Sequence, residues 1–321
     1  MPVRQHLQTT SFAFGLNCGF TAYVYSFKAP LPILYMSIFS LVDPTLVVEL
    51  LTLGLCTGFL AGLLGIGGGM LMVPFMTFIL TNKGFPTEHI VKMAVATSLA
   101  TICFTSLSSV WAHHKRGAVL WPVALMLAPG ILIGSALGAQ LAVALPGKVL
   151  SVLFAVFVAF SATQMFLNRK PKPSRVLLGK LGMFSVGGLI GVLASIVGAG
   201  GAFISVPFMT WSNVKIHNAV ATSAALGFPI AFAGTLGYIW AGWNLPPMQS
   251  TLSQSASSGS AVLAGNLGYL YLPGLIIISL ASMCTAPLGA KTAHKIDIAP
   301  LKKVFASVLY VLAAYFLIKS L

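Results

Sequence analysis

The chain has 321 residues, of which 57% are hydrophobic and 7% are charged. A soluble domain carries about 25% charged residues, so the composition excludes a water-soluble protein and indicates a polytopic protein of the lipid bilayer. The net charge of +14 does not indicate nucleic-acid binding. The basic residues lie in short loops between apolar segments, as the positive-inside rule expects of cytoplasmic loops.

The first 42 residues precede the long apolar segments. Arg4 followed by the run SFAFGLNCGFTAYVYSF resembles a signal sequence, but no A-x-A cleavage site follows it. Met36 is an alternative start of the protein. Residues 1–42 are therefore an N-terminal extension, of which residues 1–35 belong to the mature protein in one interpretation and lie upstream of it in the other.

Ten apolar segments follow, and most are long enough to cross the hydrocarbon core, which takes about 20 helical residues. Two of them, 69–82 and 201–212, are short and follow a glycine cluster directly. We expect each to be the second arm of a hairpin that turns within the membrane, with a tilted full crossing as the alternative. The predicted fold is all-α and polytopic, with about eight to ten hydrophobic helices. The segments are 46–65, 69–82, 90–112, 119–145, 148–167, 182–198, 201–212, 217–242, 267–290 and 300–319.

The loop NRKPKPSRVLLGK, residues 168–180, sets the expected orientation. It contains five basic residues and no acid, which predicts a cytoplasmic linker. Counting crossings outward from it places HHKRG, residues 113–117, in the cytoplasm and the uncharged loop 244–266 outside. Both chain ends then lie outside, whether or not the glycine hairpins cross completely.

The chain contains an internal repeat. GFLAGLLGIGGGMLMVPFM, residues 58–76, aligns without gaps on GVLASIVGAGGAFISVPFM, residues 191–209, with ten of nineteen positions identical. Two shorter matches follow in the same order: AVATS at 94–98 and 219–223, and LGAQLA at 137–142 against LGAKTA at 288–293.

We expect a first transmembrane repeat over residues 43–167 and a second over residues 181–321. Because the linker is cytoplasmic and each half has an odd number of crossings, the second repeat is inverted. Inverted repeats are the ground plan of many secondary transporters, which bind substrate near the midplane at the repeat interface.

The duplicated glycines predict an anion-binding site. A turn here exposes backbone N–H groups, and the helix that follows directs its N-terminus at the same place. The first N–H groups of a helix have no internal partner and the helix dipole adds positive charge, so such an end binds anions. The predicted substrate-binding glycines are Gly65, Gly67, Gly68 and Gly69 in the first copy and Gly198, Gly200 and Gly201 in the second.

The alternative is that these glycines only allow close helix packing, as small residues do in membranes. We expect that role for Gly130, Gly134 and Gly138. The position of both clusters before a short helix favours the anion site.

The AVATS blocks add four hydroxyl groups, which we predict to donate hydrogen bonds to the oxygens of an anion. The alternative is that they bond back to helix carbonyls, as Ser and Thr often do within helices. The four residues are Thr97, Ser98, Thr222 and Ser223.

Two matched prolines, Pro74 and Pro207, are predicted to kink or start helices and to act as hinges. The apolar segments hold almost no ionisable side chain, which argues against a proton or cation pump. The sequence has no HExxH motif, no paired acids and no CxxC motif. We therefore expect no catalytic residue, no metal site and no cofactor.

The two glycine segments, the paired AVATS blocks and APLGAKTAHKI, residues 286–296, resemble the sulfite exporter TauE/SafE family over roughly residues 45–320. The resemblance implies a multi-pass transporter of the bacterial inner membrane that exports sulfite, organosulfonates or related small anions. Gly69 is matched by Ala202 in the second copy, so one of the two turns is expected to be less open.

The leading hypothesis is a secondary transporter that moves a small sulfur-containing anion outward by alternating access. The second is a transporter or channel for another small solute, with the glycines serving packing alone. The third is a membrane thiol relay or sulfur-trafficking protein that uses Cys56 and Cys103.

Overall fold

The computed structural model describes residues 44–64, 68–167, 179–243, 266–292 and 298–320, all within one compact unit that covers Ser40–Leu321. The predicted N-terminal extension, residues 1–42, lies outside the described residues. So do most of the predicted cytoplasmic linker and nearly all of the predicted outer loop.

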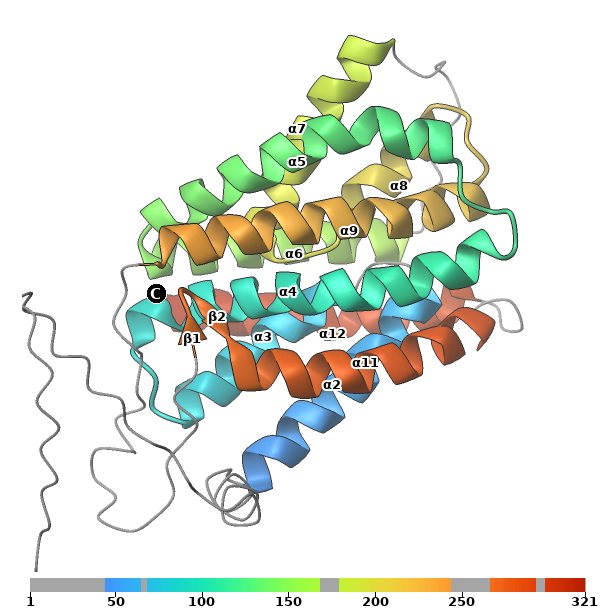
Figure 1. The fold of residues 1–321 in the computed structure, drawn as a ribbon. Helices are drawn as coiled ribbons and strands as arrows, with labels where there is room; N and C mark the ends of the chain where they lie inside the picture. Colours follow the sequence, from blue (N-terminus) through green and yellow to red (C-terminus); the bar gives the residue numbers. More distant parts are fainter. Residues whose placement is uncertain (1–43, 65–67, 168–178, 244–265, 293–297, 321) are drawn as a thin grey trace, which may run out of the picture. The chain divides into compact units, whose positions relative to one another are not determined.

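The described residues form ten helices and one small hairpin (Figure 1). Seven helices are long and apolar enough to cross a membrane, so the chain is a polytopic all-α membrane protein. The elements are α2 (Pro44–Leu64), α3 (Gly69–Asn82), α4 (Thr87–His114), α5 (Trp121–Ala144), α6 (Gly147–Leu167), α7 (Lys180–Val197), α8 (Ala202–Trp211), α9 (Ile216–Ala241), β1 (Asn266–Leu267), β2 (Leu270–Tyr271), α11 (Leu272–Thr292) and α12 (Ile298–Ser320).

The helix predicted over 267–290 begins later than the sequence suggests. Residues 266–271 instead form an antiparallel hairpin, in which Asn266 pairs with Tyr271. Gly268 makes the turn with φ of 60°, a conformation that favours glycine. Pro273 then lies in the first turn of α11, where its missing N–H removes no helical hydrogen bond.

The two largest helix interfaces each join the two halves of the chain, because α2 packs mainly against α11 and α5 packs mainly against α7. Glycines bring these helices together, as predicted for Gly130, Gly134 and Gly138. A Cβ atom added at Gly134 would overlap the carbonyl oxygen of Gly188. The α5–α7 pair therefore has almost direct backbone contact.

The centre of the fold is the crossing of α4 and α9, which hold the two AVATS blocks. Ser106 lies beside Gly227, and Leu99 lies beside Gly234, so the two helices run in opposite directions (Figure 1). α6 and α12 are also antiparallel, since Phe154 contacts Phe316 and Thr163 bonds Tyr310. Antiparallel pairing of equivalent helices is the geometry that an inverted repeat predicts.

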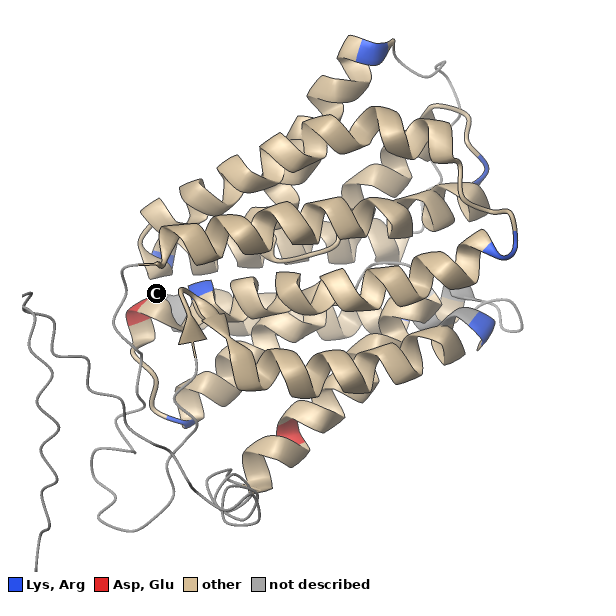
Figure 2. Ribbon diagram, in the orientation of Figure 1, with Lys and Arg blue, Asp and Glu red and all other residues tan. Residues whose placement is uncertain are grey.

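Charged residues lie near the ends of the helices, away from their middle (Figure 2). One end of the bundle combines the last turns of α4 and α11 with the starts of α7 and α9. Within the described residues this end carries basic side chains without an acid: Lys115, Arg116, Lys180, Lys215 and Lys291. We refer to it as the basic end, and the positive-inside rule predicts that it faces the cytoplasm. The opposite end, with the α3–α4 loop and the β hairpin, is called the outer end.

The orientation can be tested with single cysteines in a variant whose native cysteines are replaced by alanine. Lys148→Cys, exposed at the start of α6, should react with an impermeant maleimide in intact spheroplasts. Arg116→Cys, exposed in the α4–α5 loop, should react only after the membrane is permeabilised. The reverse labelling pattern would show that the predicted topology is inverted.

The α5–α7 interface gives a prediction about stability. Gly134→Ala should lower the free energy of unfolding by about 1–3 kcal/mol, the usual effect of overpacking, because its Cβ meets the Gly188 backbone. Gly188→Ala is the matched control, since its Cβ comes no nearer than 3.7 Å to its closest neighbour, the carbonyl oxygen of Gly130. Melting temperatures of both variants in detergent measure the difference, and equal values would contradict the packing role.

Candidate functional site

Two glycine turns of the same conformation start the two short helices. Gly68 precedes α3 with φ of 68°, and Gly201 precedes α8 with φ of 72°. Neither helix has a side-chain cap at its N-terminus. The turns thus leave the first N–H groups of α3 and α8 without a side-chain partner deep inside the protein. Gly65 and Gly67, also predicted to bind substrate, lie outside the described residues.

The first turn meets the end of α7. Gly198, with φ of 72°, caps the C-terminus of α7, and its carbonyl oxygen accepts a hydrogen bond of 2.8 Å from the Ser98 hydroxyl. Gly69 lies so close to this carbonyl and to Ala199 that a Cβ atom would overlap them. A carbonyl from the second half therefore occupies the position next to the start of α3.

The second turn borders a small cavity between α2, α4 and α9. The space open to a water-sized sphere is about 20 Å³, which is enough for about one or two water molecules. The α4 residues that line the cavity run from Ile102 to Ser109. The cavity therefore lies between the glycine turns and the basic end of the bundle. The lining residues are Ala61, Ile102, Thr105, Ser106, Ser109, Gly200, Ser223, Ala224 and Gly227.

Hydroxyl groups give this cavity its polar character. Ser109 is 6% exposed, and its buried hydroxyl has no hydrogen-bond partner. Ser223 accepts a hydrogen bond of 2.8 Å from Ser205, which leaves the proton of Ser223 available for donation. The lining contains no carboxylate. Thr105 and Ser106 donate to carbonyl oxygens of their own helix. A solute in the cavity thus meets the donors of Ser109 and Ser223 and no negative side chain.

The threonines of the AVATS blocks have a different environment from the serines. Thr97 accepts a hydrogen bond of 3.0 Å from the backbone N–H of Tyr271, just before α11. Thr222 accepts one of 3.0 Å from the N–H of Leu120, just before α5. Each threonine therefore binds the start of a helix in the opposite half, and neither lines the cavity.

The predicted hinge prolines occupy the same place in both short helices. Pro74 lies within α3 and Pro207 within α8, each five residues after the first residue of its helix. A proline inside a helix removes one backbone hydrogen bond. Their role as hinges stays a prediction.

Sequence reasoning missed Thr105, Ser106 and Ser109, which supply most of the hydroxyl groups of the cavity. They lie within the α4 segment TICFTSLSS, where hydroxyl residues recur at spacings of three and four. That spacing puts them on one side of a helix, and it could have indicated a hydroxyl-lined face of α4 from the sequence alone.

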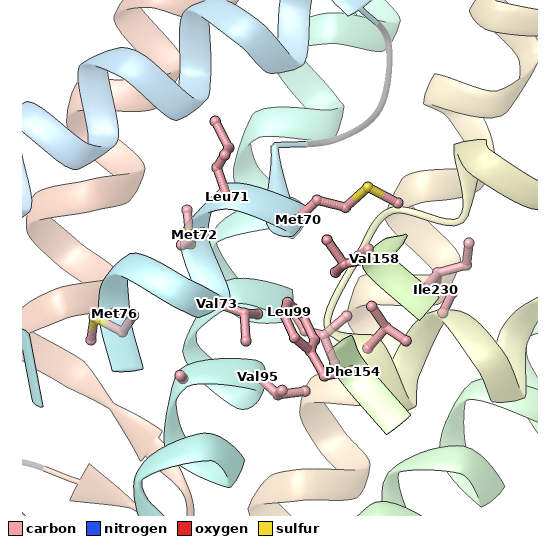
Figure 3. Close-up of a cluster of buried hydrophobic side chains, with 14 of the residues drawn as sticks. Met70, Leu71, Met72, Val73, Met76, Val95, Leu99, Phe154, Val158 and Ile230 are labelled. Carbon is pink, nitrogen blue, oxygen red and sulfur yellow. The ribbon is translucent and has the colours of Figure 1, made fainter. Parts of the chain in front are cut away.

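Apolar side chains close the region between the cavity and the outer end. A Cβ atom at Gly198 would touch Val73 and Val95, and one at Gly234 would touch Leu99. Figure 3 shows Val73, Val95 and Leu99 gathered beside Phe154. We call Val73, Val95 and Leu99 the apolar seal.

Aromatic residues pack beyond the seal at the outer end. The rings of Phe85 and Tyr271 lie 5.7 Å apart, and those of His89 and Tyr269 lie 5.8 Å apart. Burial raises the pKa of Tyr271 to about 12. Burial also raises the pKa of Tyr269, and the nearby Glu88 carboxylate raises it further. Both phenols therefore stay neutral at physiological pH.

The cysteines of the described residues are free thiols: Cys56, Cys103 and Cys284. Cys56 and Cys284 are exposed on the surface, and Cys103 is partly buried. Cys18 lies outside the described residues. Within the described part of the chain, no group of three or more His, Cys, Asp or Glu residues could hold a metal ion.

A bundle of membrane-spanning helices around a small internal cavity with hydroxyl groups in its wall is compatible with a solute transporter. The family model of the sulfite exporter TauE/SafE matches residues 50–316. The chain belongs to this family, and it is a multi-pass membrane transporter of a small solute.

Relatives in distant organisms carry the corresponding description. A probable membrane transporter protein of Haemophilus influenzae is 33% identical over 276 residues, which cover 86% of this chain and 99% of that protein. A probable membrane transporter protein of Methanocaldococcus jannaschii is 27% identical over 271 residues, covering 84% and 94%. No solved structure matches the chain.

The contact between the two turns gives a further prediction. Gly69→Ala should lower the free energy of unfolding by about 1–3 kcal/mol, because the added methyl overlaps the Gly198 carbonyl. Ala202→Gly, the reciprocal change in the second copy, should cost no more than the helix propensity of glycine, about 1 kcal/mol. Thermal unfolding of both variants tests this, and a larger loss in Ala202→Gly would contradict it.

Proposed function

We propose that this protein is a secondary transporter that exports a small sulfur-containing oxyanion, such as sulfite or a short sulfonate. The observation that carries the proposal is the cavity beside Gly200, which lies two residues before the uncapped start of α8. The hydroxyls of Ser109 and Ser223 line this cavity, and no carboxylate does. Donors fixed by the fold stabilise an oxyanion most strongly in a site that excludes water. The family described as sulfite exporters agrees with this substrate class.

The size of the cavity supports transport by alternating access. About 20 Å³ holds water but is too small for sulfite, so the surrounding helices must move apart before the anion binds. The antiparallel pairing of equivalent helices, α4 with α9 and α6 with α12, provides two halves that can exchange conformations around one site. Outward movement starts at the basic end, which the positive-inside rule places in the cytoplasm of a bacterial cell.

A small neutral solute is the second candidate, and one observation favours it. No Lys, Arg or His lines the cavity, so the site has no full positive charge to balance an anion. The two candidates differ in the response to membrane potential. Uncoupled anion efflux carries charge and accelerates when the inside of a vesicle is negative, whereas neutral flux is indifferent.

The thiol relay requires two cysteines that exchange electrons. Replacing Cys56 and Cys103 by alanine removes them both, and retained sulfite flux in this variant would exclude the relay.

The substrate site is tested by two variants in proteoliposomes loaded with radiolabelled sulfite. Gly200→Val should abolish efflux, because the side chain fills the cavity beside the turn. Steric exclusion dominates here, since a helix-end contact contributes only about 0.3–2 kcal/mol. Ser109→Ala should raise the KM about tenfold, the effect of losing one hydrogen bond to a charged group.

Ser108→Ala is the matched control for Ser109→Ala, because Ser108 is the adjacent residue of α4 and does not line the cavity. It should keep the wild-type KM. Normal sulfite affinity in both Gly200→Val and Ser109→Ala would show that the cavity is not the substrate site.

A further inference from the structure

A buried lysine lies beyond the apolar seal, toward the outer end. Lys92 is 5% exposed, and it is the one Lys, Arg, Asp or Glu that is buried among the described residues. Its ammonium group donates a hydrogen bond of 2.8 Å to the carbonyl oxygen of Val143, at the end of α5. It also lies 5.9 Å from the centre of the Tyr269 ring.

The protein gives this ammonium group little compensation for burial. An ammonium group has three donors, and the carbonyl of Val143 takes one of them. The nearest acid is Glu88, one turn earlier on α4 and exposed, and no ion pair joins it to Lys92 within the described structure. Glu88 compensates this charge in part from a distance. An anion that binds directly would take up the remaining donors of the ammonium group.

His89 faces the same aromatic ring from one turn earlier on α4. Its ring lies 5.8 Å from that of Tyr269, and its buried Nδ1 atom has no hydrogen-bond partner. Tyr269 itself is neutral, and the acid that lies near this ring is the exposed Glu88 carboxylate. His89 and Lys92 thus place two nitrogen groups with unused hydrogen-bonding capacity around one side chain.

Lys92 is also aligned with the cavity along α4. Lys92, Leu99 and Ser106 follow one another at intervals of seven residues, so they share one face of the helix at spacings of about 10 Å. Ser106 lines the cavity, and Leu99 belongs to the apolar seal. An anion that passes the seal along this face reaches Lys92 next.

The internal repeat places a basic residue at the equivalent position in both halves. Lys92 lies five residues before Thr97, and His217 lies five residues before Thr222. Lys92 is near the outer end of α4, and His217 is exposed near the basic end of α9. The repeat therefore places one basic side chain near the outer end of the bundle, Lys92, and one near the basic end, His217.

We propose that Lys92, assisted by His89, forms a second oxyanion-binding site on the outer side of the apolar seal, which holds the exported anion before release. This site rests on the proposed function, because its ligand is the transported oxyanion. It differs from the cavity beside Gly200 in using a full positive charge instead of hydroxyl and backbone donors. It lies nearer the outer end of α4 than the cavity does.

The test compares sulfite KM values at the two faces of oriented proteoliposomes. Lys92→Gln keeps a donor for the Val143 carbonyl but removes the charge, and it should raise the KM measured at the outer face about tenfold. The KM at the cytoplasmic face should change less than twofold. Lys92→Arg should restore the outer KM. His89→Gln should also raise the KM at the outer face. This variant tests the proposal if Lys92→Gln fails to fold.

Lys148→Gln is the matched control, because Lys148 is exposed at the same end of the bundle and loses the same charge. It should leave both KM values unchanged. An unchanged outer KM in Lys92→Gln, or an equal rise at both faces, would show that Lys92 only caps the end of α5. Wild-type protein without sulfite or sulfonate flux would overturn the proposed function itself, a result separate from any effect of Lys92.

Discussion

The hydrocarbon core of a bilayer contains no water to bind backbone N–H and C=O groups, so each such group needs a partner within the protein. The two glycine turns are the places where this constraint is hardest to meet. Beside the first turn, the Gly198 carbonyl has a partner within the protein, because it accepts a hydrogen bond from the Ser98 hydroxyl. The same carbonyl lies directly against Gly69. This contact joins the start of α3, the end of α7 and Ser98 of α4.

The two copies of the turn differ at the first residue of the short helix that follows. Gly69 permits a backbone carbonyl to approach, whereas Ala202 carries a side chain at the matching position. The same backbone conformation occurs at Gly68 and Gly201, but Gly69 lies against the Gly198 carbonyl, whereas Gly200 borders the cavity. The two matching sequences are thus in different surroundings.

The sequence predicted the helices well, because long apolar segments bounded by basic loops leave few alternatives in a membrane. It also predicted a glycine turn before each of the two short helices, and the structure has left-handed glycines there, Gly68 before α3 and Gly201 before α8. It did not distinguish Ser98 and Ser223 from their threonine neighbours. Thr97 and Thr222 bind backbone groups more than 100 residues away, and such partners depend on how the helices cross.

The cavity was harder to predict for the same reason. The hydroxyls of Ser106 and Ser109 are ordinary features of a membrane helix, and they become a candidate site only because α9 and the Gly200 turn pack opposite them. Lys92 could be identified as a basic residue near a segment end, but its burial depends on Val143 and on the β hairpin that follows the outer loop.

The exchange of helix partners between the halves has a consequence for how the protein is made. α2 has its main partner in α11, and α5 has its main partner in α7, so neither half can complete its packing alone. During synthesis the first half enters the membrane with glycine-lined faces open to lipid, and it must wait there until the last helices arrive. The two halves are intertwined in the way that the subunits of some dimers are. The packing of the first half is therefore complete only after the C-terminal part has been inserted.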